Sequence, residues 1–299
     1  VTLEGGGKRW EPAKKDADEY YYSGDSRVVR FEGPFPPEIS VKVSIPDSFV
    51  DDSGRSLENA QAMKDATIAL GVYPPLLKFA SGDFGVIERF ANAGVPGEED
   101  NQPPAVPLTI RGLEAGFRVD ELQRSAGSVH DYATQDDQEV LKWLARLRRL
   151  YEGPMQQQQI NNVLADREWS YSSDSPEIDT RSISVFKRLG LQAKELTLPG
   201  VPDQGETPFE VIGVPLSEPG FHVLEARSDK LGEAFLADAE PMYVRTSALV
   251  TNLGVHMKHG RDDMLVWVTT LDDDQPVANA QIRVLDCDVN ELMRGTHHA

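Results

Sequence analysis

The sequence predicts a mainly β protein of tandem antiparallel β-sandwich domains of the Ig-like type, with a helical insertion around residues 134–165. Two observations support this fold class. Runs of alternating apolar and polar residues, separated by glycine, proline and acidic residues, recur along most of the 299 residues, as in half-buried strands. Residues 134–151 instead place their apolar residues at helical spacing. We expect three units, formed by residues 1–76, 77–241 and 242–299.

Residues 1–76 are expected to form a small β-sandwich domain. Val41, Val43 and Ile45 alternate with polar residues, which is the period of a strand with one buried face. Tyr73 is followed by two prolines, and a residue before proline avoids the helical region of backbone space. This extended segment predicts the end of the first domain.

Residues 77–241 are expected to form a second β-sandwich. Its strands are expected at 76–90, 105–114, 193–199, 207–216 and 220–228. Glu98, Glu99 and Asp100 lie in a loop between the first two of these strands, and carboxylate oxygens are ligands that Ca²⁺ prefers. Because their spacing brings no further ligands, the pattern favours a solvated loop tip over a calcium site.

The helical insertion interrupts this second sandwich. Five apolar residues fall on one face of the expected helix: Val140, Leu141, Leu144, Leu147 and Tyr151. Thr134 or Asp136 is expected to cap its first turn, and Gly153 with the proline after it is expected to end it. Shorter helices are expected at 155–169 and 178–190. We expect the insertion to cover an open end of the sandwich rather than to bind a partner.

The last unit, residues 242–299, contains two histidines at a spacing that metal ligands adopt on a helix, His256 and His259. The residues around them alternate between apolar and polar, which predicts strands, and residues three apart in a strand point to opposite faces. The pattern therefore favours a sheet over a metal site. Three or four strands are expected here, whereas an Ig-like domain has about seven. We interpret this unit as the truncated first half of a further β-sandwich.

Composition excludes several classes of function. The net charge of −19 argues against nucleic-acid binding, which needs a clustered basic surface. No apolar run reaches the ~18 residues that a membrane-spanning helix needs. Cys287 is the single cysteine, so an internal disulfide is excluded. We expect it to be a small buried apolar residue rather than a nucleophile.

Motifs that identify enzymes are absent from the sequence. It contains no phosphate-binding loop, nucleophile elbow, zinc-protease motif or Cys-Xaa-Xaa-Cys pair. We therefore expect no catalytic, cofactor-binding or metal-binding residues, no cofactor and no enzymatic activity. Chains of this kind are usually scaffold or interaction proteins.

One segment resembles a known family. Residues 243–287 contain Tyr-Val-Arg-Thr, then Ala-Leu-Val-Thr-Asn-Leu, then Leu-Val-Trp-Val-Thr, and close with Pro-Val-Ala. This succession resembles bacterial α2-macroglobulins. Weaker likeness extends upstream, through "YPPLLKFASGDFGVIER", "VPLTIRGLE" and "FEVIGVPLSEPGFHVLEARSDKLG", to about residue 73.

The resemblance implies a large periplasmic protein, often lipid-anchored to the inner membrane, built of many macroglobulin-type β-sandwich domains. Such proteins trap proteases after cleavage of a bait segment, and many members capture the protease through a Cys-Xaa-Glu-Gln thioester. Cys287 lies in Leu-Asp-Cys-Asp, so it does not match the thioester motif. By this resemblance the chain is an N-terminal scaffold fragment whose expected partners are proteases, trapped through regions outside it, and other envelope proteins.

Two other functions remain open. The first alternative is a cell-envelope adhesin or protein-interaction module built of Ig-like domains, because β-sandwich loops often carry binding sites and a fold by itself does not specify function. A weaker alternative is a glycan-processing enzyme whose catalytic domain lies outside this chain.

Overall fold

The computed structural model describes residues 1–13, 29–46, 48–51, 53–56, 58–59, 62, 66–89, 103–113, 127–168, 174–198, 209–216 and 218–296. The chain divides into two compact units, Val1–Tyr73 and Pro74–Ala299, and the division falls close to the first predicted boundary. The acidic loop at 98–100 and the histidines at 297 and 298 lie outside the described residues. Several antiparallel sheets make up most of the regular structure, so the predicted mainly β class is confirmed.

The first unit contains one four-stranded antiparallel sheet. Its order is β2 (Lys8–Trp10), β1 (Thr2–Gly5), β3 (Ser40–Ser44) and β4 (Thr67–Ala69). Leu3, Val41 and Ile45 are buried. The predicted alternation therefore places its apolar side chains on the covered face of this sheet.

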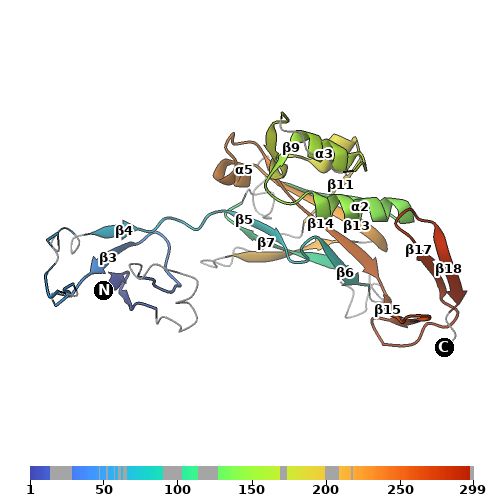
Figure 1. Ribbon diagram of the computed structural model, residues 1–299, viewed down its shortest axis with the longest axis horizontal. Coiled ribbons are helices and arrows are strands. Elements are labelled where there is room, and N and C mark those ends of the chain that lie inside the picture. Colours follow the sequence, from blue (N-terminus) through green and yellow to red (C-terminus); the bar gives the residue numbers. More distant parts are fainter. Residues whose placement is uncertain are drawn as a thin grey trace. The chain divides into compact units, whose positions relative to one another are not determined.

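The main sheets of the second unit have three and five strands (Figure 1). The three-stranded sheet has the order β12 (Glu210–Pro215), β7 (Ala105–Arg111) and β5 (Leu76–Phe79). The five-stranded sheet has the order β11 (Lys194–Glu195), β8 (Ser128–Thr134), β13 (Gly220–Ser228), β14 (Met242–Thr251) and β6 (Phe84–Glu88). All pairs are antiparallel except β14 and β6, which are parallel.

Two of these strands correct a prediction. Residues 76–90 were expected to form one strand, but they form β5 and β6, which belong to different sheets. The turn between them contains Gly82 at φ +61°, a conformation that glycine adopts without steric cost. The chain can therefore cross from one sheet to the other within a few residues.

The two sheets of the second unit pack face to face. The shared core contains Phe79, Leu108, Ile110, Val129, Val214, Leu224, Ala226, Val244 and Val250, all buried. On β13, Leu224 and Ala226 point into this core, whereas Phe221 and Val223 point to the other face. Both faces of the five-stranded sheet are therefore covered.

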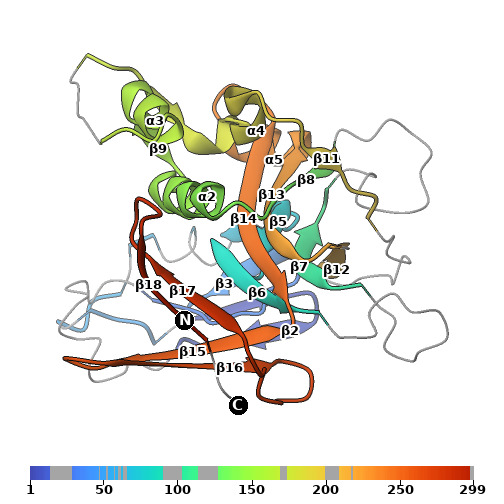
Figure 2. The same ribbon diagram turned by 90° about the vertical axis from the view of Figure 1, so that its right-hand side faces the viewer.

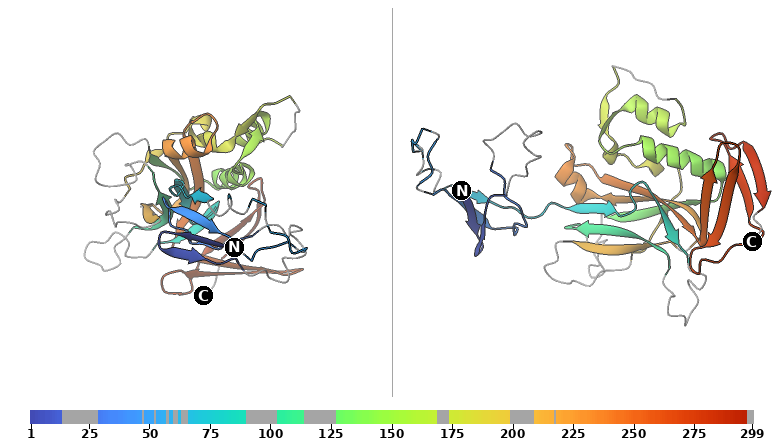
Figure 3. Two further views of the ribbon diagram at one scale, coloured as in Figure 1. Left: turned by 90° about the vertical axis from the view of Figure 1, so that its left-hand side faces the viewer. Right: turned by 60° about the horizontal axis from the view of Figure 1, so that its bottom comes forward.

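Helices cover that other face (Figure 2). They are α2 (Asp137–Arg149), α3 (Gln157–Leu164) and the short α4 (Val185–Leu189). Trp143, Ile160 and Phe186 pack with Phe221 and Val223 of β13 in a second apolar cluster. The helical insertion is confirmed, but it covers a face of the sheet and not an open end of the sandwich, as the two views in Figure 3 also show.

Details of the helix prediction are partly wrong. Asp136 caps α2 by accepting a 2.9 Å hydrogen bond from the backbone N–H of Glu139. Trp143 is fully buried, whereas Tyr151, expected on the apolar face, is 54% exposed. Because α2 ends at Arg149, Tyr151 lies beyond the helix, and the helical spacing no longer fixes its direction.

The predicted third unit begins with β14, and this strand lies within the five-stranded sheet. Two hairpins follow it, β15 (Leu253–His259) with β16 (Met264–Thr270) and β17 (Gln281–Leu285) with β18 (Glu291–Thr296). Residues 242–250 of β14 pair with β13. The predicted boundary at 241/242 stays a prediction.

Cys287 corrects another expectation. It lies in the turn between β17 and β18 and is exposed, whereas a buried position was predicted. Asp286 stabilises this turn, because its carboxylate accepts hydrogen bonds from the backbone N–H groups of Asp288 and Asn290. The cysteine follows this capping residue at the tip, away from any sheet face.

Candidate functional site

The two histidines that the sequence analysis weighed as a metal site lie in the β15–β16 hairpin. His256 is opposite Trp267 and His259 is opposite Met264. The extended backbone directs residues 256 and 259 to opposite faces of the hairpin. Among the described residues, no group of three His, Cys, Asp or Glu side chains is placed to hold a metal ion.

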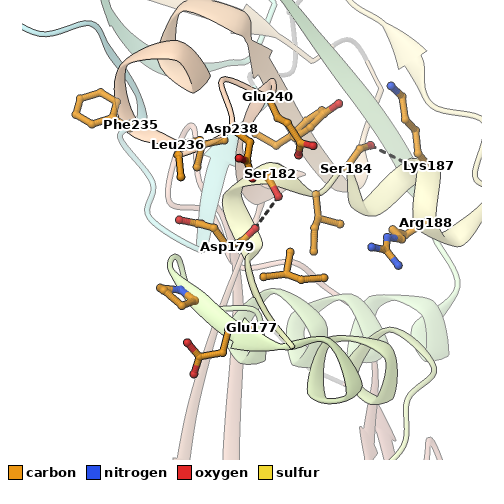
Figure 4. Close-up of a pocket in the computed structure, with 15 residues that line it drawn as sticks. Glu177, Asp179, Ser182, Ser184, Lys187, Arg188, Phe235, Leu236, Asp238 and Glu240 are labelled. Carbon is orange, nitrogen blue, oxygen red and sulfur yellow. Dashed lines mark hydrogen bonds between the residues drawn. The ribbon is translucent and has the colours of Figure 1, made fainter. Parts of the chain in front are cut away.

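A pocket of about 930 Å³ lies elsewhere in the second unit (Figure 4). It lies between two segments, which we name the first wall (177–188) and the second wall (235–240). Its apolar lining includes Ile183, Leu236 and the ring of Tyr243 on β14. This volume falls within the range of about 300–1,000 Å³ typical of ligand sites.

Buried charges hold the first wall against the five-stranded sheet. Glu225 of β13 accepts hydrogen bonds from the Ser184 hydroxyl at 2.5 Å and from the backbone N–H of Val185 at 2.7 Å. Arg245 of β14 contacts Glu225 at 3.3 Å and donates to the carbonyls of Thr180, at 2.6 Å, and Ile183. The wall therefore has a fixed position relative to β13 and β14.

The cost of burying these charges is offset by their contacts with each other and with the backbone. Side chains of Glu225 and Arg245 are 5% and 8% exposed. Burial lowers the pKa of Arg245, and the neighbouring Glu225 carboxylate opposes that shift. Removal of either partner would leave the other charge buried and unpaired, which is strongly destabilising.

The second wall follows helix α5 (Asp229–Phe235). Ser228 caps this helix by accepting a 3.1 Å hydrogen bond from the N–H of Leu231. Gly232 allows the wall to pack closely, because a Cβ atom at this position would lie 1.7 Å from the carbonyl oxygen of Glu240. A residue with a side chain at position 232 would displace the loop that carries Asp238 and Glu240.

Charged side chains surround the apolar lining. Glu177, Asp238 and Glu240 are acidic, and Lys187 and Arg188 are basic. Within the described part of the chain none of these five forms an ion pair. Asp179 differs, because its carboxylate binds the Arg181 guanidinium at 2.7 Å, and this hydrogen bond lowers the pKa of Asp179.

Sequence reasoning identified none of these pocket residues. One signal was present, since Glu225 interrupts a mainly apolar strand interior, "FHVLEA", in which His222 is the other polar residue, and a carboxylate in such a strand needs a partner. Its partners come from positions 184, 185 and 245. Arg245 is opposite Glu225 in the β13–β14 pair, whereas positions 184 and 185 approach only when the helical segment folds over the sheet, which a linear pattern does not encode.

A second buried ionic contact lies at the other face of β13. The Nδ1 atom of His222 is 3.0 Å from both carboxylate oxygens of Asp131, and its Nε2 atom is 2.9 Å from the carbonyl oxygen of Glu218. A protonated imidazole donates from both nitrogens. Burial alone would lower the pKa of His222, but Asp131 and the Glu218 carbonyl outweigh it, so the pKa is raised.

The last part of the chain is similar to a known domain family. Residues 250–299 match the family model described as the bacterial alpha-2-macroglobulin MG3 domain. A comparison with curated protein sequences found no significant match.

Two solved structures are similar to the chain. Both are native alpha-2-macroglobulin from Escherichia coli, one spanning domains NIE-MG1 and the other MG0-NIE-MG1. The first has 11% identity and a TM-score of 0.40, and the match covers 76% of this chain and 84% of that chain. The second has 12% identity and a TM-score of 0.40, with 92% and 74% covered. The predicted resemblance to the bacterial α2-macroglobulins is confirmed, and the family model that matches residues 250–299 carries it.

Proposed function

We propose that this chain is a non-catalytic β-sandwich scaffold within a bacterial α2-macroglobulin-like protein that traps proteases in the cell envelope. The match of residues 250–299 to the MG3 domain model is the observation that carries the proposal. The two stacked sheets of the second unit support a scaffold role, because both faces of the central sheet are packed.

In this proposal the protein works in the periplasm, with a lipid anchor to the inner membrane as a further part of the hypothesis. Proteases are the partners, and they are held through regions other than residues 1–299. No described helix is long and apolar enough to cross a membrane. The proposed role of these residues is to position other domains, without a reacting side chain of their own.

Incubation of the complete protein with a broad-specificity protease tests the proposal. Trapping should shift the electrophoretic mobility of the complete protein, block digestion of a large protein substrate and leave hydrolysis of a small chromogenic peptide intact. Residues 1–299 alone should do none of this. An unchanged mobility together with undiminished digestion of the large substrate would contradict trapping.

The alternative of an interaction module has one observation in its favour. The β15–β16 hairpin exposes Val255, Met257, Leu265 and Trp267, and exposed apolar groups often mark contact surfaces. A protein that binds an envelope partner through this hairpin, and that leaves protease digestion of large substrates unaffected, would fit that alternative better.

A further inference from the structure

The pocket between the first wall (177–188) and the second wall (235–240) is formed by a part of the chain that the family model does not match. Its residues come from β10 (Glu177–Asp179), η3 (Thr180–Ser182), α4, α5 and β14. They lie outside residues 250–299, where the family model matches. Its chemistry is therefore a question separate from the proposed scaffold role.

Both walls are held in place without a ligand. The Glu225 and Arg245 contacts fix residues 180–185, and the second wall packs so closely on α5 that a Cβ atom at Gly232 would clash with the carbonyl oxygen of Glu240. A site with a fixed position loses little conformational entropy when a ligand binds. This pocket is therefore preformed in the absence of a ligand.

Two pairs of like charges lie around the pocket. Asp238 and Glu240 lie together in the second wall, and Lys187 and Arg188 lie together on α4 (Figure 4). Glu177, also acidic, lies apart from both pairs in the first wall. The four side chains of the two pairs belong to exposed residues, so they can meet a ligand without a change in fold. Opposite charges on two sides select a ligand that carries both signs, and they reject a ligand with one sign only.

The apolar lining lies with these charges in the same pocket. Ile183 and Tyr243 are buried, and Leu236 is half-buried, so the lining offers a firm apolar surface to one side chain. The pocket is open to solvent, which lets a longer chain pass through it. A short peptide with a basic, an apolar and an acidic side chain in succession matches all three parts.

We infer that this pocket binds a mixed-charge peptide segment of a partner protein. The basic side chain of the segment pairs with Asp238 and Glu240, its apolar side chain contacts Leu236 and Ile183, and its acidic side chain pairs with Lys187 and Arg188. Charge pairs at a solvent-exposed rim contribute more to selectivity than to affinity. The site is therefore expected to discriminate between sequences while binding each one weakly.

The test uses two peptides that each carry no net charge. The probe is acetyl-Ser-Lys-Leu-Asp-Ser-amide, and the matched peptide is acetyl-Ser-Gln-Leu-Asn-Ser-amide. A neutral probe avoids general attraction to a chain of net charge −19. Isothermal titration of the full chain should give an affinity about tenfold higher for the Lys-Leu-Asp peptide than for the Gln-Leu-Asn peptide.

Three double variants locate the binding. Asp238→Asn with Glu240→Gln, and separately Lys187→Gln with Arg188→Gln, should each abolish the tenfold preference. The control, Asp262→Asn with Asp263→Asn, removes two charges from the exposed β15–β16 turn and should preserve it. All six positions are exposed, so the three variants are expected to keep the melting temperature of the parent.

Three results would overturn the inference. They are equal affinity for the two peptides, binding of neither peptide at millimolar concentration, and a loss of preference in the Asp262/Asp263 control as large as in the pocket variants. None of these results bears on protease trapping by the complete protein. The inference and the proposed function can therefore fail separately.

Discussion

The β13–β14 pair and the β15–β16 hairpin follow one another in the chain, yet their side chains have opposite environments. Seven of the nine residues of β13 are buried, and the other two, Gly220 and Arg227, are half-buried. In β15, by contrast, only Gly254 is buried. Both are extended segments that contain several apolar residues. The difference arises because β13 has a sheet on one face and helices on the other.

This contrast shows that periodicity and burial are separate properties. A period of two tells which side chains share a face, but it does not tell whether anything covers that face. For β13 the cover comes from β5, β7 and β12 on one side and from α2 and α4 on the other. The described residues provide no such cover for Val255, Met257 or Trp267.

The largest expected effect comes from Trp143, at the centre of the helical layer. Its ring is fully buried and lies 5.7 Å from the ring of Tyr132 and 5.9 Å from the ring of Phe186. Trp143→Ala should lower the free energy of unfolding by about 3–5 kcal/mol, because it leaves a cavity under α2. Urea unfolding followed by circular dichroism measures this change.

Trp143→Phe is the matched control for this prediction. It keeps an aromatic ring between Tyr132 and Phe186 and should lose clearly less stability than the alanine variant. A loss below about 1 kcal/mol for Trp143→Ala would show that the helices cover the sheet loosely. The contrast between the covered sheet and the open hairpin would then be wrong.

The sequence predicted the fold class, the helical insertion and most strands, because these follow from local spacing. It was misleading where the burial of a side chain depends on segments far away in the sequence. Trp267 lies in "MLVWVTT", the most apolar strand of the last unit, yet its side chain is 51% exposed. The pocket residues were missed for the same reason, since Glu225 meets Arg245 by strand pairing but meets Ser184 only after residues 180–185 fold over the sheet.

A pH-dependent effect should distinguish the covered sheet from the hairpin. The pKa of His222 is raised in the folded state, chiefly because Asp131 and the Glu218 carbonyl outweigh the effect of burial. Because the folded-state pKa of His222 is raised, its contact with Asp131 stabilises the fold fully at pH values below the pKa of an unfolded histidine, about 6.5. That stabilisation is lost as the pH rises through the folded-state value.

Asp131→Asn removes the carboxylate and tests this dependence. The difference in unfolding free energy between parent and variant should be greatest below pH 6.5 and should shrink as the pH rises. Urea midpoints at a series of pH values measure it. His256→Gln, which removes an exposed histidine from β15, serves as the control and should reproduce the parent profile. A difference for Asp131→Asn that stays constant with pH would mean that the His222 contact is not ionic.

The smallest effect is expected at Trp267, and it is the most direct test of the contrast. This side chain lines a groove of about 380 Å³ with His256, Lys258 and Leu265 on one face of the hairpin. Because half of it remains exposed, Trp267→Ala should cost less than about 1 kcal/mol of unfolding free energy, against the larger loss expected at Trp143. Parallel urea titrations of the two alanine variants compare them. A loss at Trp267 as large as at Trp143 would require a surface that covers the indole in solution, and stability would then depend on protein concentration if that surface belonged to a second copy.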